Sequence, residues 1–308
     1  MYPVFACRIA AEWRNDMREK KLRSIKTARF RETAMKIVFL ICACVSIIAV
    51  ILICVFLFAN GIPTMFKIGL GDFLLGTEWK PAQELYGIFP MIIGSIYVTA
   101  GAIVFGVPTG ILCAVFLAKF CPRQLYKITK SFIQLLAGIP SIVYGFFGLV
   151  VIVPLMQNLF GGSGKSMLTA SILLGIMILP TIISVSESAI RAVPESYYEG
   201  SLALGATHER SVFFVTVPAC KSAITAGVIL GIGRAIGETM AVVMIAGNQP
   251  IIPSGLVSGV RTLTANVVLE MAYATDLHRE ALIATAVVLF VFVLIINVLF
   301  SLLKKKEG

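Results

Sequence analysis

The sequence has few charged residues. Asp, Glu, Lys and Arg together make up 14% of its 308 positions, whereas hydrophobic residues make up 58%. The mean hydropathy is +0.94. A water-soluble domain needs a polar surface around its core and does not reach this balance. The composition therefore excludes an ordinary soluble protein and predicts that most of the chain contacts lipid or other membrane spans.

Acidic residues are scarcer than basic ones. The sequence has 16 Asp and Glu and 26 Lys and Arg, which gives a formal net charge of +10. An excess of cations can indicate nucleic acid binding. Here, however, the cations lie beside the ends of apolar runs and are not interleaved with aromatic residues. Attraction to the surface of a lipid bilayer explains them better, so no nucleic acid partner is predicted.

The sequence also lacks the side chains that metal binding or catalysis would need. Its two histidines, His208 and His278, are far apart and have no Cys or His at ligand spacing nearby. The seven cysteines imply no disulfide framework. No nucleophile, base or metal set can be assembled from these residues. We therefore predict no catalytic residue and no metal site, and we expect the protein not to be an enzyme.

One segment resembles a nucleotide-binding loop but fails its pattern. Residues 161–166 read Gly-Gly-Ser-Gly-Lys-Ser. The pattern G-x-x-x-x-G-K-[ST] needs a glycine five positions before Gly164, and the sequence has Leu159 there. The segment also follows an apolar run instead of a soluble strand. We expect a flexible turn here, and no ATPase site in this chain.

Six apolar runs are long enough to cross about 30 Å of hydrocarbon as helices. They predict an all-α, polytopic membrane protein with about six transmembrane helices. The first run is not a signal peptide, because a basic arm at 1–35 precedes it and no small-residue cleavage site follows it. Breaks by Gly and Pro are expected at 106–108, 138–140 and Pro180, and ordinary use of these residues in membrane helices is the alternative. The predicted spans are 36–59, 90–118, 131–160, 167–189, 222–247 and 281–303.

Lys and Arg gather on one predicted side of the membrane. They occur in the arm 1–35, between the second and third spans, around 190–221 and in the tail 304–308. Cationic loops resist translocation, so this side and both termini are expected to be cytoplasmic. Segments 60–89 and 248–280 are then external loops. The cations on the external side are only Lys67, Lys80, Lys165, Arg261 and Arg279.

The polar stretch 190–221 is expected to form a compact cytoplasmic loop. Pro194 stands where a helix can begin, and Gly205 interrupts the helical pattern after about two turns. Glycine permits the tight bend that such an interruption needs. The stretch therefore predicts two short helices joined at Gly205.

The same stretch resembles the EAA loop of ABC importer permeases, whose pattern is E-A-A-x3-G-x9-I-x-L-P. Glu199, Gly205 and Pro218 fall at the required spacing, small residues replace the two alanines, and Glu209 stands where an aromatic residue is common. The resemblance implies that the two short helices sit in a cleft on a separate ATP-hydrolysing subunit, whose movement rocks the membrane helices. The residues to which it assigns this coupling are Glu199, Gly200, Ser201, Gly205, Ala206 and Pro218.

The predicted span 222–247 contains an arginine and a glutamate at depth. Arg234 comes about twelve residues after Ser222, roughly 18 Å along the helix and near mid-membrane. Glu238 follows at i+4, on the same face of a continuous helix. Ionised residues at that depth cost about 3 kcal/mol each, so we expect the pair to face the bundle interior or a water-lined path. A self-neutralising ion pair that fixes helix packing is the alternative.

The side-chain chemistry of this pair favours phosphate as the solute. A guanidinium offers a planar fork of donors to an oxyanion and stays charged. Glu238 can accept a proton that phosphate still carries near neutrality, whereas sulfate carries none. The alternatives are an importer of another oxyanion such as sulfate or molybdate, for which no Arg–Glu pair is expected, and a proton-coupled transporter, which usually shows inverted repeats or several intramembrane carboxylates.

Segments 234–242 (R-A-I-G-E-T-M-A-V) and 137–145 (A-G-I-P-S-I-V-Y-G), together with Gly247-Asn248, resemble the C-type permease of the phosphate importer. The similarity runs from about residue 91 to the end. It implies the type I ABC importer permease fold over 91–303, a bacterial inner (plasma) membrane location, and a phosphate path through Arg234 and Glu238. It also implies that ATP and Mg²⁺ bind only to the ATPase. The implied partners are a second, homologous permease, two ATPase subunits and an external phosphate-binding protein.

Overall fold

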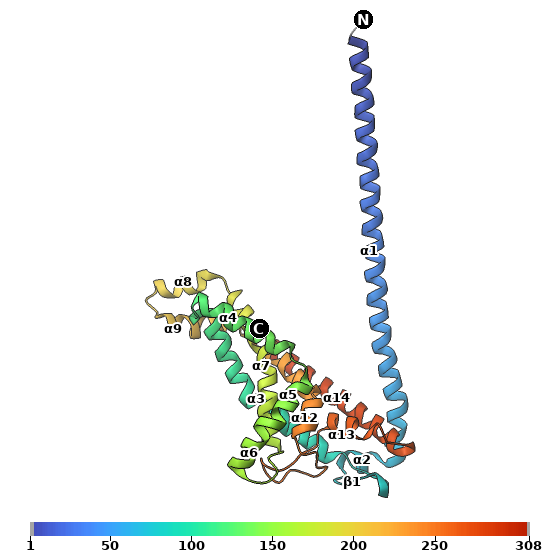
Figure 1. The fold of residues 1–308 in the computed structure, drawn as a ribbon, viewed down its shortest axis with the longest axis vertical. Helices are drawn as coiled ribbons and strands as arrows, with labels where there is room; N and C mark the ends of the chain where they lie inside the picture. Colours follow the sequence, from blue (N-terminus) through green and yellow to red (C-terminus); the bar gives the residue numbers. More distant parts are fainter. Residues whose placement is uncertain (1–2, 307–308) are drawn as a thin grey trace. The chain divides into compact units, whose positions relative to one another are not determined.

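Figure 1 shows a computed structural model of the chain, in which helices predominate. The structure describes the backbone of residues 3–306 and the side-chain surroundings of residues 32–299 and 302. The charged side chains of the predicted arm before residue 32 and of the predicted tail 304–308 lie outside these described residues. The chain divides into two units, residues 1–56 and 57–308, and each is described by itself.

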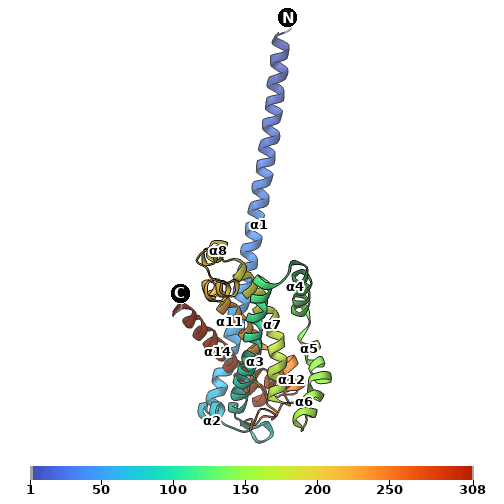
Figure 2. The ribbon, with the colours of Figure 1, turned by 90° about the vertical axis from the view of Figure 1, so that its left-hand side faces the viewer.

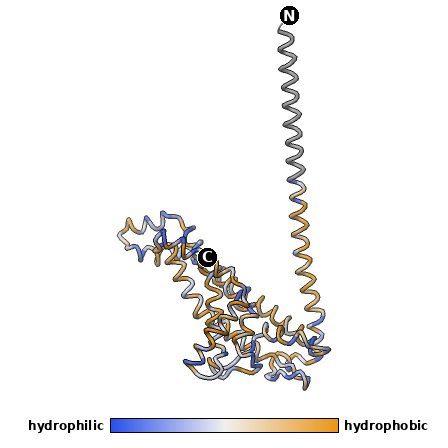
Figure 3. Tube along the Cα trace, in the orientation of Figure 1, coloured by the Kyte–Doolittle hydropathy of each residue, from blue (hydrophilic) through white to orange (hydrophobic). Residues whose placement is uncertain are grey.

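Helix α1 (Pro3–Ile68) makes up the first unit and continues into the second. Its residues Glu32–Ile68 are apolar enough to cross a membrane, and Figure 3 shows the hydrophobic colour along this segment. In the first unit, large side chains all around the helix are exposed, including Phe39, Leu40 and Leu52. A helix that is apolar on every side is typical of a membrane span.

The second unit is a bundle around α3 (Phe89–Val115), α7 (Met167–Arg191) and α11 (Lys221–Gly237). Helix α7 lies at its centre, because most of its residues are buried. Small residues bring α3 and α7 together: a Cβ on Gly106 would lie 2.9 Å from the carbonyl oxygen of Gly175. The two helices can therefore approach as closely as their backbones allow.

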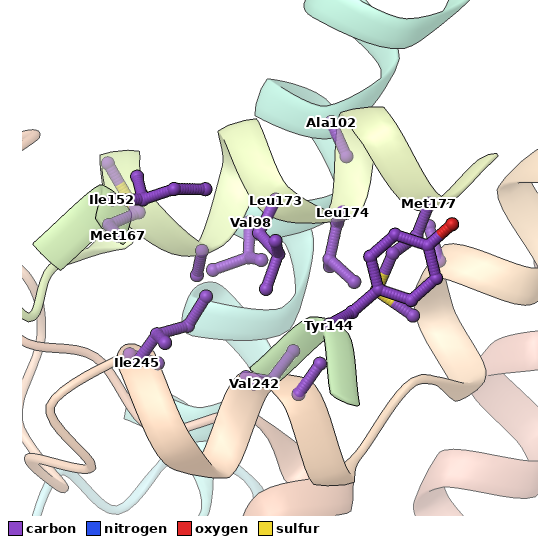
Figure 4. Packing of buried hydrophobic residues seen from close by; sticks show 14 of the residues in the cluster. Val98, Ala102, Tyr144, Ile152, Met167, Leu173, Leu174, Met177, Val242 and Ile245 are labelled. Carbon is purple, nitrogen blue, oxygen red and sulfur yellow. The ribbon is translucent and has the colours of Figure 1, made fainter. Parts of the chain in front are cut away.

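Residues 123–160 form separate helices, which corrects the predicted span from 131. Helix α4 (Arg123–Gly138) ends before Pro140, because proline has no N–H to donate and holds Ile139 in an extended conformation. The apolar span begins at α5 (Ser141–Phe147) and continues through a π-helical turn into α6 (Val153–Phe160). Figure 4 shows how Tyr144 of α5 packs into the core beside Met177 of α7.

Only one of the three predicted Gly–Pro breaks interrupts a helix, the one at 138–140. Pro108 and Pro180 lie inside α3 and α7, which continue through them, so the predicted breaks at these positions are wrong. A proline removes one helical hydrogen bond. The close packing between α3 and α7 offsets that loss. Residues 161–166 form the predicted turn, in which Gly161, Gly162 and Gly164 have positive φ angles.

The two ends of the bundle carry different structures. At one end, which we call the hairpin end, α2 (Leu70–Leu75) precedes an antiparallel pair of short strands, β1 (Trp79–Lys80) and β2 (Leu85–Tyr86). Helix α13 (Leu263–Glu270) packs in the same buried cluster. Figure 2 shows α8 at the opposite end of the bundle from α2, and we call it the α8 end.

The structure has five helices long and apolar enough to cross a membrane among its described residues, and six if the bent pair His208–Ala219 and Lys221–Gly237 is one span. The two members of that pair meet at 72°. This agrees with about six predicted spans. The predicted span 222–247 is two helices, α11 and α12 (Met240–Ile245), and the last span lies in α14 (Asp276–Lys306).

Candidate functional site

Arg234 lies in the last turn of α11, where that helix packs against α7. Gly231 makes the packing close, since a Cβ there would lie 2.9 Å from Cγ1 of Ile182. The half-buried guanidinium of Arg234 donates from Nη1 to Oγ1 of Thr181 at 3.5 Å, the long limit of a hydrogen bond. This is one weak protein partner, within the described part of the chain, for a group with five N–H donors.

Tyr144 of α5 is a polar neighbour of Arg234 that the sequence analysis did not identify. Its side chain packs in the same buried cluster as Ala235, the residue after Arg234. The Tyr144 hydroxyl donates to the carbonyl oxygen of Leu136 at 2.8 Å, across the break between α4 and α5. Tyr144 therefore ties the end of α4 to the surroundings of Arg234.

Glu238 lies at a break in the span, which corrects the prediction that it follows Arg234 on one helical face. Helix α11 ends at Gly237, and Glu238 has an extended backbone with φ −71° and ψ 129°. The backbone N–H of Ala241, in the first turn of α12, donates to Oε1 of Glu238 at 3.3 Å. Glycine weakens the helix at this point, and the carboxylate satisfies an N–H that the break leaves without a helical partner.

Arg234 and Glu238 do not form an ion pair. Among the described residues, no carboxylate oxygen lies within 4.0 Å of the Arg234 guanidinium. The self-neutralising packing pair is therefore absent from this structure. Arg234 lies just before the helix break and Glu238 lies at it. Among the described residues, each side chain has one hydrogen bond to a protein group, so most of its donors or acceptors are open to a solute.

Helix α12 and the break are held by contacts from other elements. The Thr264 hydroxyl of α13 donates to the backbone carbonyl oxygen of Glu238 at 3.2 Å. Gly145 of α5 permits close packing, because a Cβ there would lie 2.9 Å from Cα of Ala241. These contacts come from residues far away in the sequence, and they fix where the short helix begins.

A buried polar network at the hairpin end centres on Glu270, which is 7% exposed. Its Oε1 pairs with Nη1 of Arg261 at 2.5 Å. Its Oε2 accepts a hydrogen bond from Nε1 of Trp79 at 2.8 Å and lies 2.9 Å from Nε2 of His278. One carboxylate thus joins the β1–β2 hairpin, the loop before α13, and the start of α14.

The same network reaches α12. Arg261 donates from Nε to the carbonyl oxygen of Asn248 at 2.9 Å, and the Asn248 side chain donates to the carbonyl oxygen of Val243 at 2.7 Å. The sequence alone predicts Arg261 as an external cation and assigns no role to Glu270. Their partners lie up to 191 residues apart. In the sequence, only the nearness of Arg261 to Glu270, nine residues later, could have suggested that these two residues form an ion pair.

The α8 end carries the predicted pair of short helices, α8 (Glu195–Ala203) and α9 (His208–Ser211). Pro194 directly precedes α8, and Gly205 bends the chain between the helices with a φ of +87°. The prediction of two helices joined at Gly205 is confirmed. The Tyr198 hydroxyl and Nδ1 of His208 lie 2.7 Å apart and tie the two helices together.

The structure places the six predicted coupling residues on two separate parts of this loop. Glu199, Gly200 and Ser201 lie in α8, and Gly205 and Ala206 form the bend. Pro218 lies in α10 (Val217–Ala219), after a π-helical turn and just before the 72° bend into α11. The loop also exposes large apolar side chains, of which Leu204 is 90% and Phe214 76% exposed. Such an apolar patch on a small loop is typical of a protein contact.

The loop is fastened to residues 116–120, a π-helical turn that directly follows α3. Lys119 pairs with Glu195 of α8 at 3.4 Å and lies over the ring of Tyr198. The ring of Phe120 contacts that of His208, with centroids 4.6 Å apart. These contacts join α8 and α9 to residues 116–120.

Residues 106–307 match the family described as "Binding-protein-dependent transport system inner membrane component". The chain belongs to this family. The family's inner-membrane, multi-pass character agrees with the candidate spans of the structure. The matched region starts within α3 and includes α8, Gly205, Arg234 and Glu238.

Relatives of this inner-membrane transport component carry more specific names. "Probable ABC transporter permease protein YqgH" of Bacillus subtilis is 36% identical over 294 residues, which cover 92% of this chain and 95% of the relative. "Phosphate transport system permease protein PstC" of Mesorhizobium japonicum is 35% identical over 246 residues, which cover 73% of this chain and 75% of the relative.

A solved structure of the MetNI methionine ABC transporter in an inward-facing conformation shares the fold of this inner-membrane component. The TM-score is 0.56 at 18% sequence identity, and the likeness covers 75% of this chain and all of the solved chain (100%). At that identity the likeness concerns the fold alone. It confirms the all-α, type I ABC importer permease fold predicted from the sequence.

Proposed function

We propose that this chain is the permease subunit of an ATP-driven importer of inorganic phosphate, and that it forms half of the translocation path. The proposal rests on one observation above the others: a guanidinium in the last turn of α11 with one weak hydrogen bond among the described residues, followed by a carboxylate at a helix break. An oxyanion supplies the acceptors that Arg234 lacks, and a protonated one also supplies a donor for Glu238. Relatives named as phosphate permeases support the same solute.

The partners in this proposal follow from the exposed loop at the α8 end. Two ATPase subunits bind ATP and Mg²⁺ on the cytoplasmic side, and one of them receives α8, α9 and the exposed Leu204. A second, homologous permease completes the path, and an external phosphate-binding protein delivers the solute at the hairpin end. Both termini are then cytoplasmic, as the distribution of Lys and Arg favours. This chain itself holds no cofactor.

The proposal is tested by uptake of labelled phosphate into vesicles that contain this chain with its second permease, ATPase and binding protein. We expect uptake that needs ATP and that a tenfold excess of sulfate does not compete. Uptake driven by a proton gradient without ATP would instead indicate a secondary transporter. Competition by sulfate or molybdate at equal concentration would indicate a different oxyanion importer.

The bend at Gly205 provides a prediction about ATPase binding. Replacing Gly205 by valine puts a β-branched side chain at φ +87°, a left-handed conformation that costs about 1–2 kcal/mol for an L-residue. We expect the bend to open and the amount of ATPase that copurifies with the permease to fall several-fold.

Gly162→Val is the matched control for that change. Gly162 lies in the turn 161–166, outside the α8–α9 loop, and has a φ of +71°. A Cβ at either glycine would meet no atom within 4 Å, so both variants put valine at a positive φ without crowding. Equal ATPase copurification for the two variants would show that the bend at Gly205 is not needed.

A further inference from the structure

A second buried carboxylate, Glu187, lies near the α8 end of α7 and is 1% exposed. It forms ion pairs with Lys130 of α4 and with Arg191, one turn later on α7. The Tyr126 hydroxyl donates to Oε1 of Glu187 at 2.9 Å. A buried carboxylate persists only when it is paired and hydrogen-bonded, so these three partners hold α4 and α7 in one arrangement.

Lys130 is charged in this arrangement. Burial alone would lower the pKa of Lys130, but its hydrogen bond to Glu187 and the negative charge of that carboxylate raise the pKa above its usual value. The attraction between Lys130 and Glu187 therefore persists at any pH near neutrality. Lys127, one turn earlier on the same helix, is exposed and forms no ion pair among the described residues.

The Glu187 network lies between the α8–α9 loop and the solute site. On one side, Arg191 donates to the carbonyl oxygen of Leu117 in the π-helical turn after α3, and α8 begins four residues after Arg191. On the other side, α4 continues to Leu136, whose carbonyl oxygen accepts the Tyr144 hydroxyl. Tyr144 in turn packs in the same buried cluster as Ala235, the residue after Arg234. The path from the loop to Arg234 therefore consists of hydrogen bonds, ion pairs, helix α4, the short connection between α7 and α8, and side-chain packing.

We infer that Glu187 is a positioning residue that couples movement of the α8–α9 loop to α4, and through Tyr144 to the surroundings of Arg234. The inference rests on the proposed function, because it requires an ATPase that moves the loop. Lys130 and Tyr126 connect α4 to the Glu187 carboxylate of α7, while Arg191 contacts the same carboxylate from within α7. Loss of the carboxylate charge leaves the helices in place but lets α4 move independently of the loop.

The experiment compares Glu187→Gln with the native chain in the complete complex, reconstituted in vesicles with the binding protein. Phosphate uptake and ATP hydrolysis are measured on the same preparation, and the result is the number of phosphates carried per ATP. We expect that ratio to fall about tenfold, a typical size for coupling between two sites, while ATP hydrolysis stays within about twofold. A purely structural role would lower both rates together.

Variants of α4 complete the test. Lys130→Met is expected to lower the number of phosphates carried per ATP as much as Glu187→Gln does. The double variant is expected to have the same ratio as either single variant. Lys130→Arg is expected to keep the native ratio. Lys127→Met is the matched control and should change nothing. A native ratio in Glu187→Gln overturns the inference. If that variant does not assemble, a native ratio in Lys130→Met overturns it equally. Absence of ATP-driven uptake by the native complex would instead reject the proposed function.

Discussion

Replacing Arg234 by alanine is expected to abolish ATP-driven phosphate uptake while the complex still assembles. The guanidinium makes one weak hydrogen bond to Thr181, so its removal costs the fold little. It would, however, remove the charged donors for the solute in a region of low dielectric. A charged hydrogen bond contributes about 1.5–3 kcal/mol, so losing two of them lowers uptake by about 100-fold or more.

The measurement is the initial rate of labelled-phosphate uptake, with assembly followed by copurification of the ATPase. Arg234→Lys keeps the charge but not the planar fork, and should retain part of the activity. Arg123→Ala, which removes an exposed arginine on α4, is the matched control and should leave uptake unchanged. Unchanged uptake in Arg234→Ala would reduce Arg234 to a packing residue.

The second large effect is expected for Glu270→Ala, which should lower the free energy of unfolding of the bundle by about 3–5 kcal/mol. The change leaves Arg261 with its charge buried and without its carboxylate partner, since the Arg261 side chain is only 14% exposed. It also removes the acceptor for the Trp79 indole N–H. Thermal unfolding of the purified complex in detergent measures the loss.

Glu280→Ala is the matched control for Glu270. It breaks an ion pair with Lys67 that is 2.9 Å long but has exposed side chains, 60% for Lys67 and 42% for Glu280. Exposed pairs contribute about 0–1 kcal/mol, so the unfolding temperature should hardly change. The double change Glu270→Leu with Arg261→Met should recover part of the loss, because it leaves no buried charge. Equal unfolding temperatures for the two alanine variants would contradict the prediction.

Several features of the chain followed from the sequence because each depends on a local stretch of residues. An apolar run crosses a membrane because of its own length and composition, and the structure has spans close to those predicted for 36–59, 90–118 and 167–189. Gly205 bends the loop at the α8 end because glycine accepts a positive φ at little cost. The spacing of the loop residues likewise pointed to the ABC permease fold that the comparisons confirm.

The position of Glu238 and both buried networks were decided only in the tertiary structure. Residues 222–247 have no proline and look like one apolar helix, yet the chain breaks after Gly237, where Thr264 binds the backbone of Glu238 and the Glu238 carboxylate caps α12. Glu187 meets Lys130 across 57 positions, and Glu270 meets Trp79 across 191. The composition and spacing of the sequence show which charged residues exist and how deep in the membrane they are expected to lie. Which charges pair depends on packing between helices that are distant in the chain, because a buried charge is stable only where another helix brings its partner.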